Sequence, residues 1–355
     1  MSDLKAESMQ ANEKEEGVYA PASLGRTIAD RKKNIKKGNY CEIPPFPREI
    51  FLDLTSFCNH RCVFCSNPHI KNKKTMEPDM VVRVLREAYE CGVRDLGLYA
   101  TGESFLVKSL PEYVAEAKRI GYEYLFITTN GALATPDRAK AVLDAGLDSI
   151  KFSISAGRPE TYKIIQGKDD FETVISNLRW VSNYRKESGL KYRIYVTMVY
   201  TNKTKDEVEI LRNIVQPLID EWDPHPLNNQ CGNMYENNKI GEILDHSPRA
   251  RGHTNICFQP FKGFTITPEG LISACVLDYS KDLVVGDLTK NSLKEIWEGE
   301  IYRNFRKRHL NKDLKGLICY NCMHNQNEPV EPLMPEYVQH FEKDFEKNKD
   351  YEKAL

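Results

Sequence analysis

The sequence predicts an α/β protein in which parallel β-strands alternating with helices are followed by a smaller domain built around a β-hairpin. Three observations lead to this prediction. Strand-like and helix-like segments alternate from about residue 49 to residue 219, the loops between them are short, and short strands around a turn follow residue 256. Parallel strands need helical crossovers, whereas neighbouring antiparallel strands are joined by tight turns. A chain of 355 residues is long enough for two domains.

The alternating region divides into strands and helices that follow one another along the chain. In order, they are a strand over 50–55, a helix over 78–91, a strand over 95–99, a helix over 110–120, a strand over 124–129, a helix over 136–145, a strand over 149–154, a helix over 171–187, a strand over 192–200 and a helix over 205–219. The first helix carries one apolar stripe, formed by Val81, Val82, Val84, Leu85 and Ala88. Right-handed crossovers place the carboxyl ends of the strands at one rim, so residues that follow the strands are expected to meet there.

The remainder of the chain predicts a second, smaller unit. Residues 223–256 are rich in Asn, Pro, His and Gly and are expected to form a loop. Strands over 263–267 and 271–274 flank Pro268-Glu269-Gly270, which is typical of a hairpin, and 293–308 predicts one helix. The expected domains are a partly disordered arm (1–44), a barrel (45–225), a linker (226–256), an auxiliary domain (257–330) and a charged helix or tail (331–355).

Composition and charge exclude several classes of protein. The chain has 50 basic and 51 acidic side chains, which gives a formal charge of -1 and no broad basic face for nucleic acid. No apolar run approaches the roughly 20 residues of a membrane span. The polar N-terminus lacks the apolar segment of a secretory signal, so we expect a cytoplasmic protein.

Ten cysteines are the strongest functional signal in the sequence. In a reducing compartment, grouped cysteines bind metal more often than they form disulfides. Cys58, Cys62 and Cys65 directly follow the first predicted strand. Iron–sulfur clusters usually take four thiolates, so three would leave one iron open for chemistry. Two alternatives are buried cysteines on one helix face, and a zinc site with His60 as the fourth ligand.

The arrangement Cys58-x3-Cys62-x2-Cys65 after the first strand of a βα repeat resembles the radical SAM superfamily, whose fold is a partial (βα)6 barrel. The resemblance covers about residues 45–225. It implies a [4Fe–4S] cluster whose open iron chelates S-adenosylmethionine (SAM). It also implies an external one-electron donor of the flavodoxin or ferredoxin type, and cleavage of SAM to methionine and a 5′-deoxyadenosyl radical.

The same resemblance implies contacts to SAM at strand ends. These are Phe64 and Thr197 near the adenine, Gly102 and Glu103 near the amino group, Asn130 in a Thr-Asn-Gly turn, and Ser153 and Ser155 near the ribose or carboxylate. The chain departs from the family at Thr101, because the family often has Gly-Gly-Glu where this sequence has Thr-Gly-Glu. Taken singly, each residue is equally compatible with an ordinary turn or strand end.

A second set of cysteines comprises Cys257, Cys275, Cys319 and Cys322. Four thiolates make a closed site for either zinc or a [4Fe–4S] cluster, and the spacing alone does not choose between them. This region contains Gly270 and the short segments Val-Gly-Asp-Leu and Ser-Leu-x-Glu-Ile-Trp. It resembles the twitch form of the SPASM extension, which implies one auxiliary cluster. The spacing is similar to that of the aminoglycoside-pathway alcohol dehydrogenase of the family and unlike the three-cysteine molybdopterin-pathway member.

The resemblance implies hydrogen abstraction from a small polar substrate, such as a sugar or cyclitol, with two possible outcomes. In dehydrogenation a base takes a proton and the auxiliary cluster takes an electron. In epimerisation a thiol returns a hydrogen atom, and Cys231, in the irregular loop between the domains, is the candidate donor; a packing role is its alternative. Cys91, at the end of an amphipathic helix, is expected to belong to the core, Cys41 is expected to be incidental, and the sequence names no base. Other hypotheses are a peptide-modifying maturase and a non-catalytic metal scaffold.

Overall fold

The computed structural model describes residues 40–243 and 257–339, and its centre is a nine-stranded sheet with the order β6-β5-β4-β3-β2-β1-β7-β8-β9. The strands are β1 (Glu49–Leu52), β2 (Asp95–Gly97), β3 (Tyr124–Thr129), β4 (Ser149–Ser153), β5 (Arg193–Tyr200), β6 (Glu221–Pro226), β7 (Thr265–Ile266), β8 (Leu271–Ser273) and β9 (Val284–Asp287). Strands β1 to β6 are parallel, and β7 pairs parallel to β1. Strands β8 and β9 continue the sheet antiparallel.

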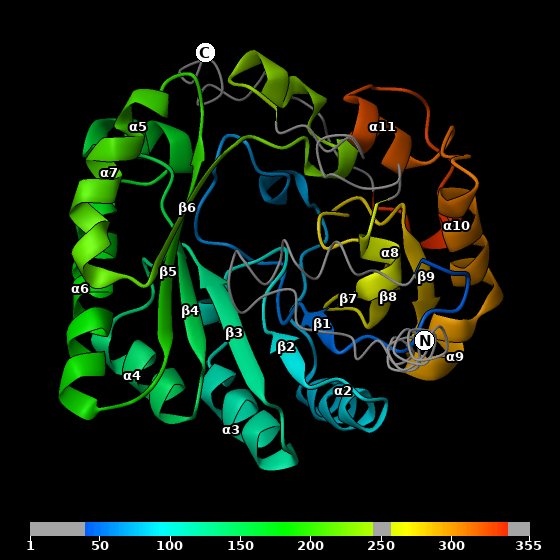
Figure 1. Cartoon of the computed structure of the whole chain (residues 1–355), viewed down its shortest axis with the longest axis horizontal. Coiled ribbons are helices and arrows are strands. Elements are labelled where there is room, and N and C mark those ends of the chain that lie inside the picture. Colours follow the sequence, from blue (N-terminus) through cyan, green and yellow to red (C-terminus); the bar gives the residue numbers. More distant parts are fainter. Residues whose placement is uncertain (1–39, 244–256, 340–355) are drawn as a thin grey trace, which may run out of the picture.

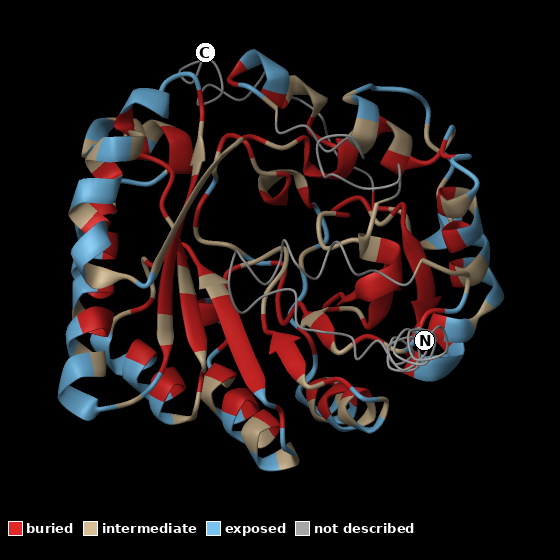
Figure 2. Cartoon of the chain, viewed as in Figure 1, coloured by how far each residue is buried: buried red, intermediate tan, exposed pale blue. Residues whose placement is uncertain are grey.

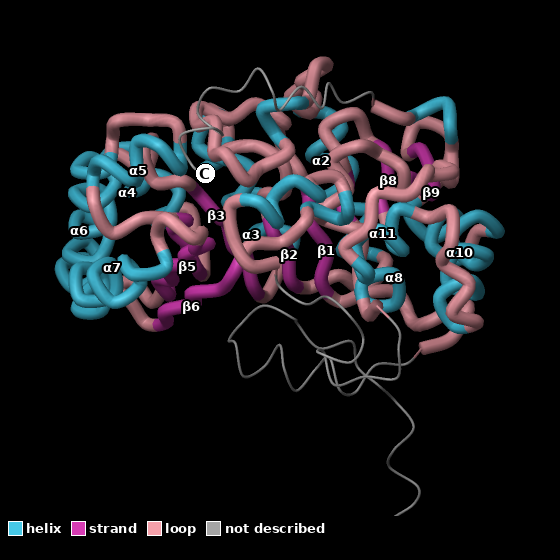
Figure 3. Tube along the Cα trace, turned by 90° about the horizontal axis from the view of Figure 1, so that it is seen from above, coloured by secondary structure: helices cyan, strands magenta, loops and turns pink. Residues whose placement is uncertain are grey.

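Most of the helices lie on the outer side of the sheet (Figure 1). The helices are α2 (Pro78–Glu90), α3 (Leu110–Ile120), α4 (Pro136–Asp144), α5 (Pro159–Gln166), α6 (Phe171–Ser188), α7 (Val208–Val215), α8 (Gln259–Lys262), α9 (Leu293–Glu298), α10 (Glu300–Leu310) and α11 (Ile318–His324). Viewed from above, α4, α5, α6 and α7 lie at the end of the sheet with β5 and β6, and α8, α10 and α11 lie at the other end, beside β8 and β9 (Figure 3). None of the helices in the described ranges is long and apolar enough to cross a membrane.

The outer face of the sheet forms the main core. Alternate strand residues such as Ile50, Leu52 and Leu96 are fully buried and share one hydrophobic cluster with Val84 and Leu85 of α2. Since successive side chains in a strand point to opposite faces, the residues between them face inward, toward the middle of the molecule. Figure 2 shows the strands as mostly buried, whereas the outward sides of α6 and α7 are exposed. The inner face is therefore left for function.

Most predicted elements are confirmed, and the fold class is the predicted α/β fold with a parallel-rich sheet and a C-terminal hairpin. Five elements were not predicted: α5, β6, α8, β9 and α11. Strand β6 begins before residue 223 and makes the loop prediction for 223–226 wrong. The single helix over 293–308 is also wrong, because Gly299 separates α9 from α10 with an extended ψ of 160°. A β-carbon at Gly299 would lie 2.7 Å from the Glu295 carbonyl oxygen.

The predicted arm and tail fall mostly on residues 1–39 and 340–355, which lie outside the described residues, as does the linker segment 244–256. Residues 227–243, also assigned to the linker, are described and carry two short 3-10 helices, Gln230–Gly232 and Tyr235–Lys239. The hairpin of the second predicted domain joins the sheet of the first, because β7 pairs with β1.

Candidate functional site

Cys58, Cys62 and Cys65 lie in an irregular loop after β1. The loop is tied to the end of α5, because Arg61 N donates to Gln166 O (3.3 Å) and Val63 N donates to Ile165 O (2.9 Å). Inside the loop, Cys65 N donates to Cys62 O at 3.1 Å. No helix runs through residues 58–65, so these cysteines do not form a helix face and that alternative is wrong.

The three thiols lie close enough to influence one another. Burial raises the pKa of the Cys58 thiol to about 11, and it also raises the pKa values of Cys62 and Cys65, with the neighbouring thiols of the set adding to the effect at Cys58 and Cys62. Lys73 opposes the rise at Cys58 and Cys65. Buried thiols with raised pKa values release their protons when metal binds, so this donor set fits an iron–sulfur cluster.

His60 is engaged elsewhere and does not complete a zinc site. Its Nε2 lies 3.1 Å from Asp170 Oδ2, and its Nδ1 lies 3.4 Å from Gln166 Nε2. The ring is buried, and desolvation lowers its pKa. Because both ring nitrogens have protein partners, His60 anchors the cysteine loop to α5 and the loop after it.

Gly102 and Glu103 lie at the predicted rim and join the ends of β2 and β3. A β-carbon at Gly102 would lie 2.0 Å from the Thr55 carbonyl oxygen, so only glycine fits. The buried Glu103 carboxylate accepts from Thr129 Oγ1 (2.7 Å), Asn130 N (2.8 Å) and Phe105 N (3.1 Å). Glu103 thus organises this rim.

Asn130 and Phe64 lie beside the cysteine loop. Asn130 Nδ2 donates to Asn59 Oδ1 (2.8 Å) and approaches Cys58 Sγ at 3.9 Å. Phe64 is buried, and its carbonyl oxygen accepts from Asn237 Nδ2 at 3.0 Å. Both residues thus adjoin the cysteine loop, and their roles as SAM contacts stay predictions.

Ser153, Ser155 and Thr197 lie at the ends of β4 and β5. Ser155 is fully buried, and its hydroxyl has no hydrogen-bond partner, so it is available to a bound molecule. Thr197 Oγ1 instead donates to Asp223 O at 3.0 Å, and Ser153 O accepts from Gln166 Nε2 at 3.3 Å. The roles of these residues as SAM contacts stay predictions.

A buried carboxylate, Asp53, extends the inner face beyond β1. Phe51 precedes it by two residues and packs against Phe126 across Gly97, where a β-carbon would lie 2.8 Å from the Phe51 ring. Asp53 Oδ2 accepts from Thr101 N (3.2 Å) and from Thr101 Oγ1. Burial raises the pKa of Asp53 to about 7, and the nearby Glu269 carboxylate adds to the rise.

Unpartnered hydroxyl groups share this inner face. Thr265 pairs with Phe51 in the sheet register, and Thr128 lies two residues beyond Phe126, so both face inward. The hydroxyls of Thr128 and Thr265 are buried without a hydrogen-bond partner. Buried polar atoms are rarely left unsatisfied, so these groups fit a polar ligand.

The second set of cysteines lines one cavity together with Cys231. The cavity is otherwise mainly apolar, with Ala274, Leu283 and Phe305 among its lining residues. No three His, Cys, Asp or Glu side chains in residues 40–243 and 257–339 converge closely enough to hold one metal ion. Four thiolates in such a cavity suit either a zinc ion or a [4Fe–4S] cluster.

His309 supplies an independent sign of an occupant in this cavity. It lines the cavity, burial lowers its pKa to about 3, and neither ring nitrogen has a hydrogen-bond partner. A neutral imidazole carries one N–H, which a cluster sulfur would accept. Cys257, Cys275, Cys319 and Cys322 therefore fit a [4Fe–4S] cluster better than an empty apolar core.

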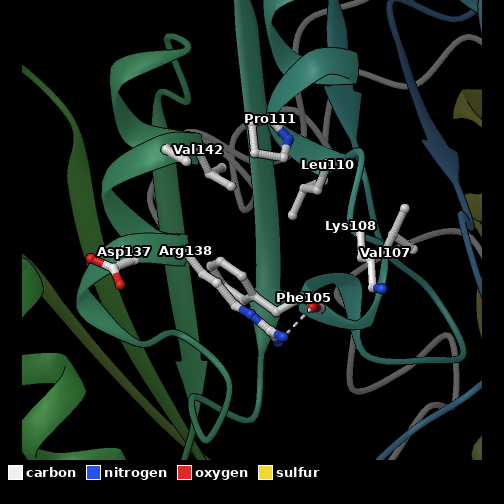
Figure 4. Close-up of a pocket in the computed structure, with 9 residues that line it drawn as sticks. Phe105, Val107, Lys108, Leu110, Pro111, Asp137, Arg138 and Val142 are labelled. Carbon is white, nitrogen blue, oxygen red and sulfur yellow. Dashed lines mark hydrogen bonds between the residues drawn. The ribbon is translucent and has the colours of Figure 1, made fainter.

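A separate cavity of about 220 Å³ lies between the starts of α3 and α4 (Figure 4). Arg138 Nη1 donates there to Phe105 O at 3.3 Å. The lining residues are Phe105, Val107, Lys108, Leu110, Pro111, Asp137, Arg138, Ala141 and Val142. Since the lining contains neither a cysteine nor a predicted contact, we do not assign this cavity to the site.

The fold and the two cysteine sites define an iron–sulfur enzyme with an α/β sheet. A model of the radical SAM superfamily matches residues 52–214, and a model of the SPASM iron–sulfur cluster-binding domain matches residues 257–323. The two matches together span more than half of the chain. The chain belongs to the radical SAM superfamily, with a SPASM-type C-terminal domain, and its cofactors are SAM, a SAM-binding cluster and an auxiliary cluster.

Relatives and solved structures agree on the fold but differ in their named functions. A probable GTP 3′,8-cyclase of Metallosphaera sedula is 27% identical over 66% of this chain and 74% of its own length. The structure of BtrN with AdoMet and 2-DOIA covers 82% of this chain and 98% of its own, with 18% identity and a TM-score of 0.54. Streptococcus suis SuiB, bound to the precursor peptide SuiA, covers 82% and 75%, with 15% identity and a TM-score of 0.60.

Sequence reasoning missed three residues of the site. Asp53 lies inside the predicted strand over 50–55, and it becomes a strand-end residue only because β1 ends at Leu52. Tyr279 is buried, and its hydroxyl is within hydrogen-bonding reach of the Cys65 thiol, although it comes from the auxiliary domain. His309 lies one residue beyond the helix predicted over 293–308. No local signal in the sequence marks its ring as buried.

Proposed function

We propose that this enzyme dehydrogenates a small, hydroxyl-bearing substrate of the sugar or cyclitol type. The observation that carries the proposal is Asp53, a buried carboxyl with a pKa of about 7 on the inner face, which the unpartnered hydroxyls of Thr128 and Thr265 share. A general base works best when its pKa lies near the working pH. Buried hydroxyl groups without protein partners suit a polar substrate that hydrogen-bonds to them, and an apolar substrate would leave them unsatisfied.

When bound, SAM and its cluster supply the radical that takes a hydrogen atom from a substrate carbon, and the auxiliary cluster supplies an acceptor for one electron. Asp53 accepts the proton of the substrate hydroxyl, and the two Thr101 donors hold its carboxylate in place. The hydroxyls of Thr128 and Thr265 orient the substrate. The substrate thus loses one hydrogen atom, one proton and one electron, and its alcohol becomes a carbonyl.

The position of Cys231 supports dehydrogenation over epimerisation. Its thiol lies in the auxiliary cavity, within hydrogen-bonding reach of the thiols of Cys275 and Cys322. A hydrogen-atom donor has to reach the substrate carbon opposite the radical. A buried thiol among cluster ligands is badly placed for this, so we do not propose Cys231 as the donor.

The named functions of the relatives give two competing substrates. A nucleoside triphosphate is the first, named for the probable GTP 3′,8-cyclase that is 27% identical to this chain. Glu269 forms an ion pair with Lys281 (3.0 Å), so the charge on this face does not speak against phosphates. A peptide is the second, by the likeness to SuiB, which at 15% identity concerns the fold alone. We keep both as alternative substrates for the turnover test.

The proposal also includes an external flavodoxin- or ferredoxin-type donor, a cytoplasmic location and the domain limits given from the sequence. The domain limits need one addition, since the sheet continues from β1 into β7 and the auxiliary domain shares that sheet.

The test is anaerobic turnover with dithionite, SAM and panels of sugars, cyclitols, nucleotides and short peptides. We expect 5′-deoxyadenosine to form together with a sugar or cyclitol product that lacks two hydrogens. A product of unchanged mass that takes up deuterium from the solvent would instead establish epimerisation. A modified peptide or nucleotide would contradict the proposed substrate.

A further inference from the structure

The auxiliary cavity holds more thiols than one cluster needs. A [4Fe–4S] cluster takes four thiolates, one for each iron. Five cysteines line this cavity: Cys231, Cys257, Cys275, Cys319 and Cys322. The thiol of Cys319 lies near those of Cys257, Cys275 and Cys322, and the thiol of Cys231 lies near those of Cys275 and Cys322. Cys275 and Cys322 therefore have neighbours from both the SPASM region and the preceding loop.

The fold holds the Cys231 thiol in this place. Gln230 and Cys231 both have left-handed backbone conformations, with φ of 46° and 60°, which residues other than glycine adopt only where the surrounding structure holds them. Asn229 secures the turn, because its Nδ2 donates to Cys322 O (3.0 Å) and its Oδ1 accepts from Gly232 N (3.1 Å). The side chain of Cys231 is consequently 2% exposed.

Close packing between the turn and α11 strengthens this arrangement. A β-carbon at Gly232 would lie 2.8 Å from Asn321 Cβ and 3.0 Å from Cys322 N. The helix that carries two of the cluster cysteines and the loop that carries Cys231 therefore form one packed unit. A thiol fixed in this way can bind an iron of the cluster without a rearrangement of the chain.

We propose that Cys231 is a fifth ligand of the auxiliary site. Its thiolate replaces the thiolate of Cys257 on the fourth iron. With the cluster bound, the Cys231 thiolate would take the iron that Cys257 leaves, and the proton of the Cys231 thiol would pass to the departing Cys257 thiolate. No electron is gained or lost, so the step needs no oxidant or reductant. The inference concerns ligation alone and stands whatever the substrate is.

The test counts iron at the auxiliary site alone. All variants carry Cys58→Ala, Cys62→Ala and Cys65→Ala, which remove the other cluster, and each is reconstituted anaerobically in the full chain. Iron and sulfide per chain are then measured, together with the EPR signal after reduction. We expect Cys257→Ala and Cys231→Ala each to keep a complete cluster, and the double variant to lose most of its iron.

Two controls make the result specific. Cys91→Ala combined with Cys257→Ala should behave like Cys257→Ala, because Cys91 lies on α2's end outside the cavity. Cys319→Ala should lose the cluster by itself. The proposal is overturned when Cys257→Ala loses as much iron as Cys319→Ala does, or when the double variant keeps its cluster.

A second measurement leaves Cys257 in place, in case its replacement prevents folding. The rate of iron release to a chelator is compared between the chain with Cys231 and the Cys231→Ala variant, with circular dichroism as the check on folding. We expect several-fold faster release from Cys231→Ala, because no spare thiol recaptures the iron. Equal rates would contradict a ligating role and leave Cys231 as a packing residue.

Discussion

Replacing Asp53 by Asn removes the proposed base and leaves the cluster cysteines in place. Burial raises the pKa of this carboxyl from its ordinary value of 3.8 to about 7. The folded chain therefore binds the proton more tightly than the unfolded chain. The resulting stabilisation is complete below about pH 4 and is lost as the pH rises through about 7. The amide introduced by Asp53→Asn does not titrate, so the variant should lack this pH dependence.

The size of the effect follows from the displacement of the pKa. A change from 3.8 to about 7 corresponds to at most about 4 kcal/mol of unfolding free energy. Asp53 is 1% exposed, so solvent screens this effect little. At roughly 2 °C per kcal/mol for a chain of this size, the variant should gain up to about 8 °C in melting temperature relative to the native chain between pH 4 and pH 8.5.

The assay combines melting curves of the anaerobic holoenzyme with turnover. Asp53→Asn should still form 5′-deoxyadenosine from SAM, because Asp53 is not among the cluster cysteines, and it should lose at least about 100-fold in oxidised product. The native enzyme's kcat/KM should rise with pH through about 7. Full product formation by the variant would refute the role of Asp53 as base.

Asp278 supplies the matched control. Burial also raises its pKa to about 7, yet its carboxylate accepts from Ser273 Oγ (2.8 Å) and Leu283 N (2.9 Å) in a turn of the auxiliary domain. Asp278→Asn should change the pH dependence of stability in the same direction and leave the acid limb of kcat/KM in place. If both variants lose the acid limb of kcat/KM, that limb reflects the stability of the chain and not base catalysis by Asp53.

Three further changes test other contacts of the two sites. Gly102→Ala should destabilise the rim by at least about 3 kcal/mol, measured as reduced melting temperature and iron content, because its β-carbon would meet Thr55 O at 2.0 Å. Glu103→Gln should cost about 2 kcal/mol and raise the KM for SAM, since an amide N–H would face donors such as Asn130 N; an unchanged KM would contradict this. His309→Phe should lower the auxiliary-cluster potential by about 40 mV, equivalent to roughly 1 kcal/mol for one electron, in an EPR-monitored titration.

The sequence predicts the first five strands and the first cysteine site well because the signals there are local. Helix α3 was predicted with its observed bounds, and it begins at Leu110 with a proline in its first turn and ends before Gly121 in a left-handed conformation. The spacing of Cys58, Cys62 and Cys65 is also a local property. Such elements need little from the rest of the fold.

Strand β6 shows where local signals fail. Its sequence, Glu-Trp-Asp-Pro-His-Pro, has low strand propensity and two prolines. It forms because it is an edge strand paired with β5 alone, and Thr197 Oγ1 adds a bond to Asp223 O. Prolines are tolerated on such edges, where one side of the strand needs no donor. Only the tertiary pairing reveals this strand.

Cys231 shows the same limit at the level of function. In the sequence it stands apart from both cysteine sets, and a hydrogen donor was a reasonable hypothesis for a thiol between two cluster domains. Its location became clear only through Asn229 and Gly232, which fix the turn against α11. Neither contact has a signature in the sequence, because both join segments about 90 residues apart.

The loop that carries Cys231 also joins the two metal centres. Near its start, Asn229 Nδ2 donates to the carbonyl of Cys322, and near its end Asn237 Nδ2 donates to the carbonyl of Phe64. Tyr279 makes a second connection, from the auxiliary domain to Cys65. Electron transfer and shared substrate binding both require two centres at a fixed separation. The three contacts that bridge the domains hold the two sites at such a separation. The segment is polar and irregular but buried, because its asparagine amides make two of these contacts.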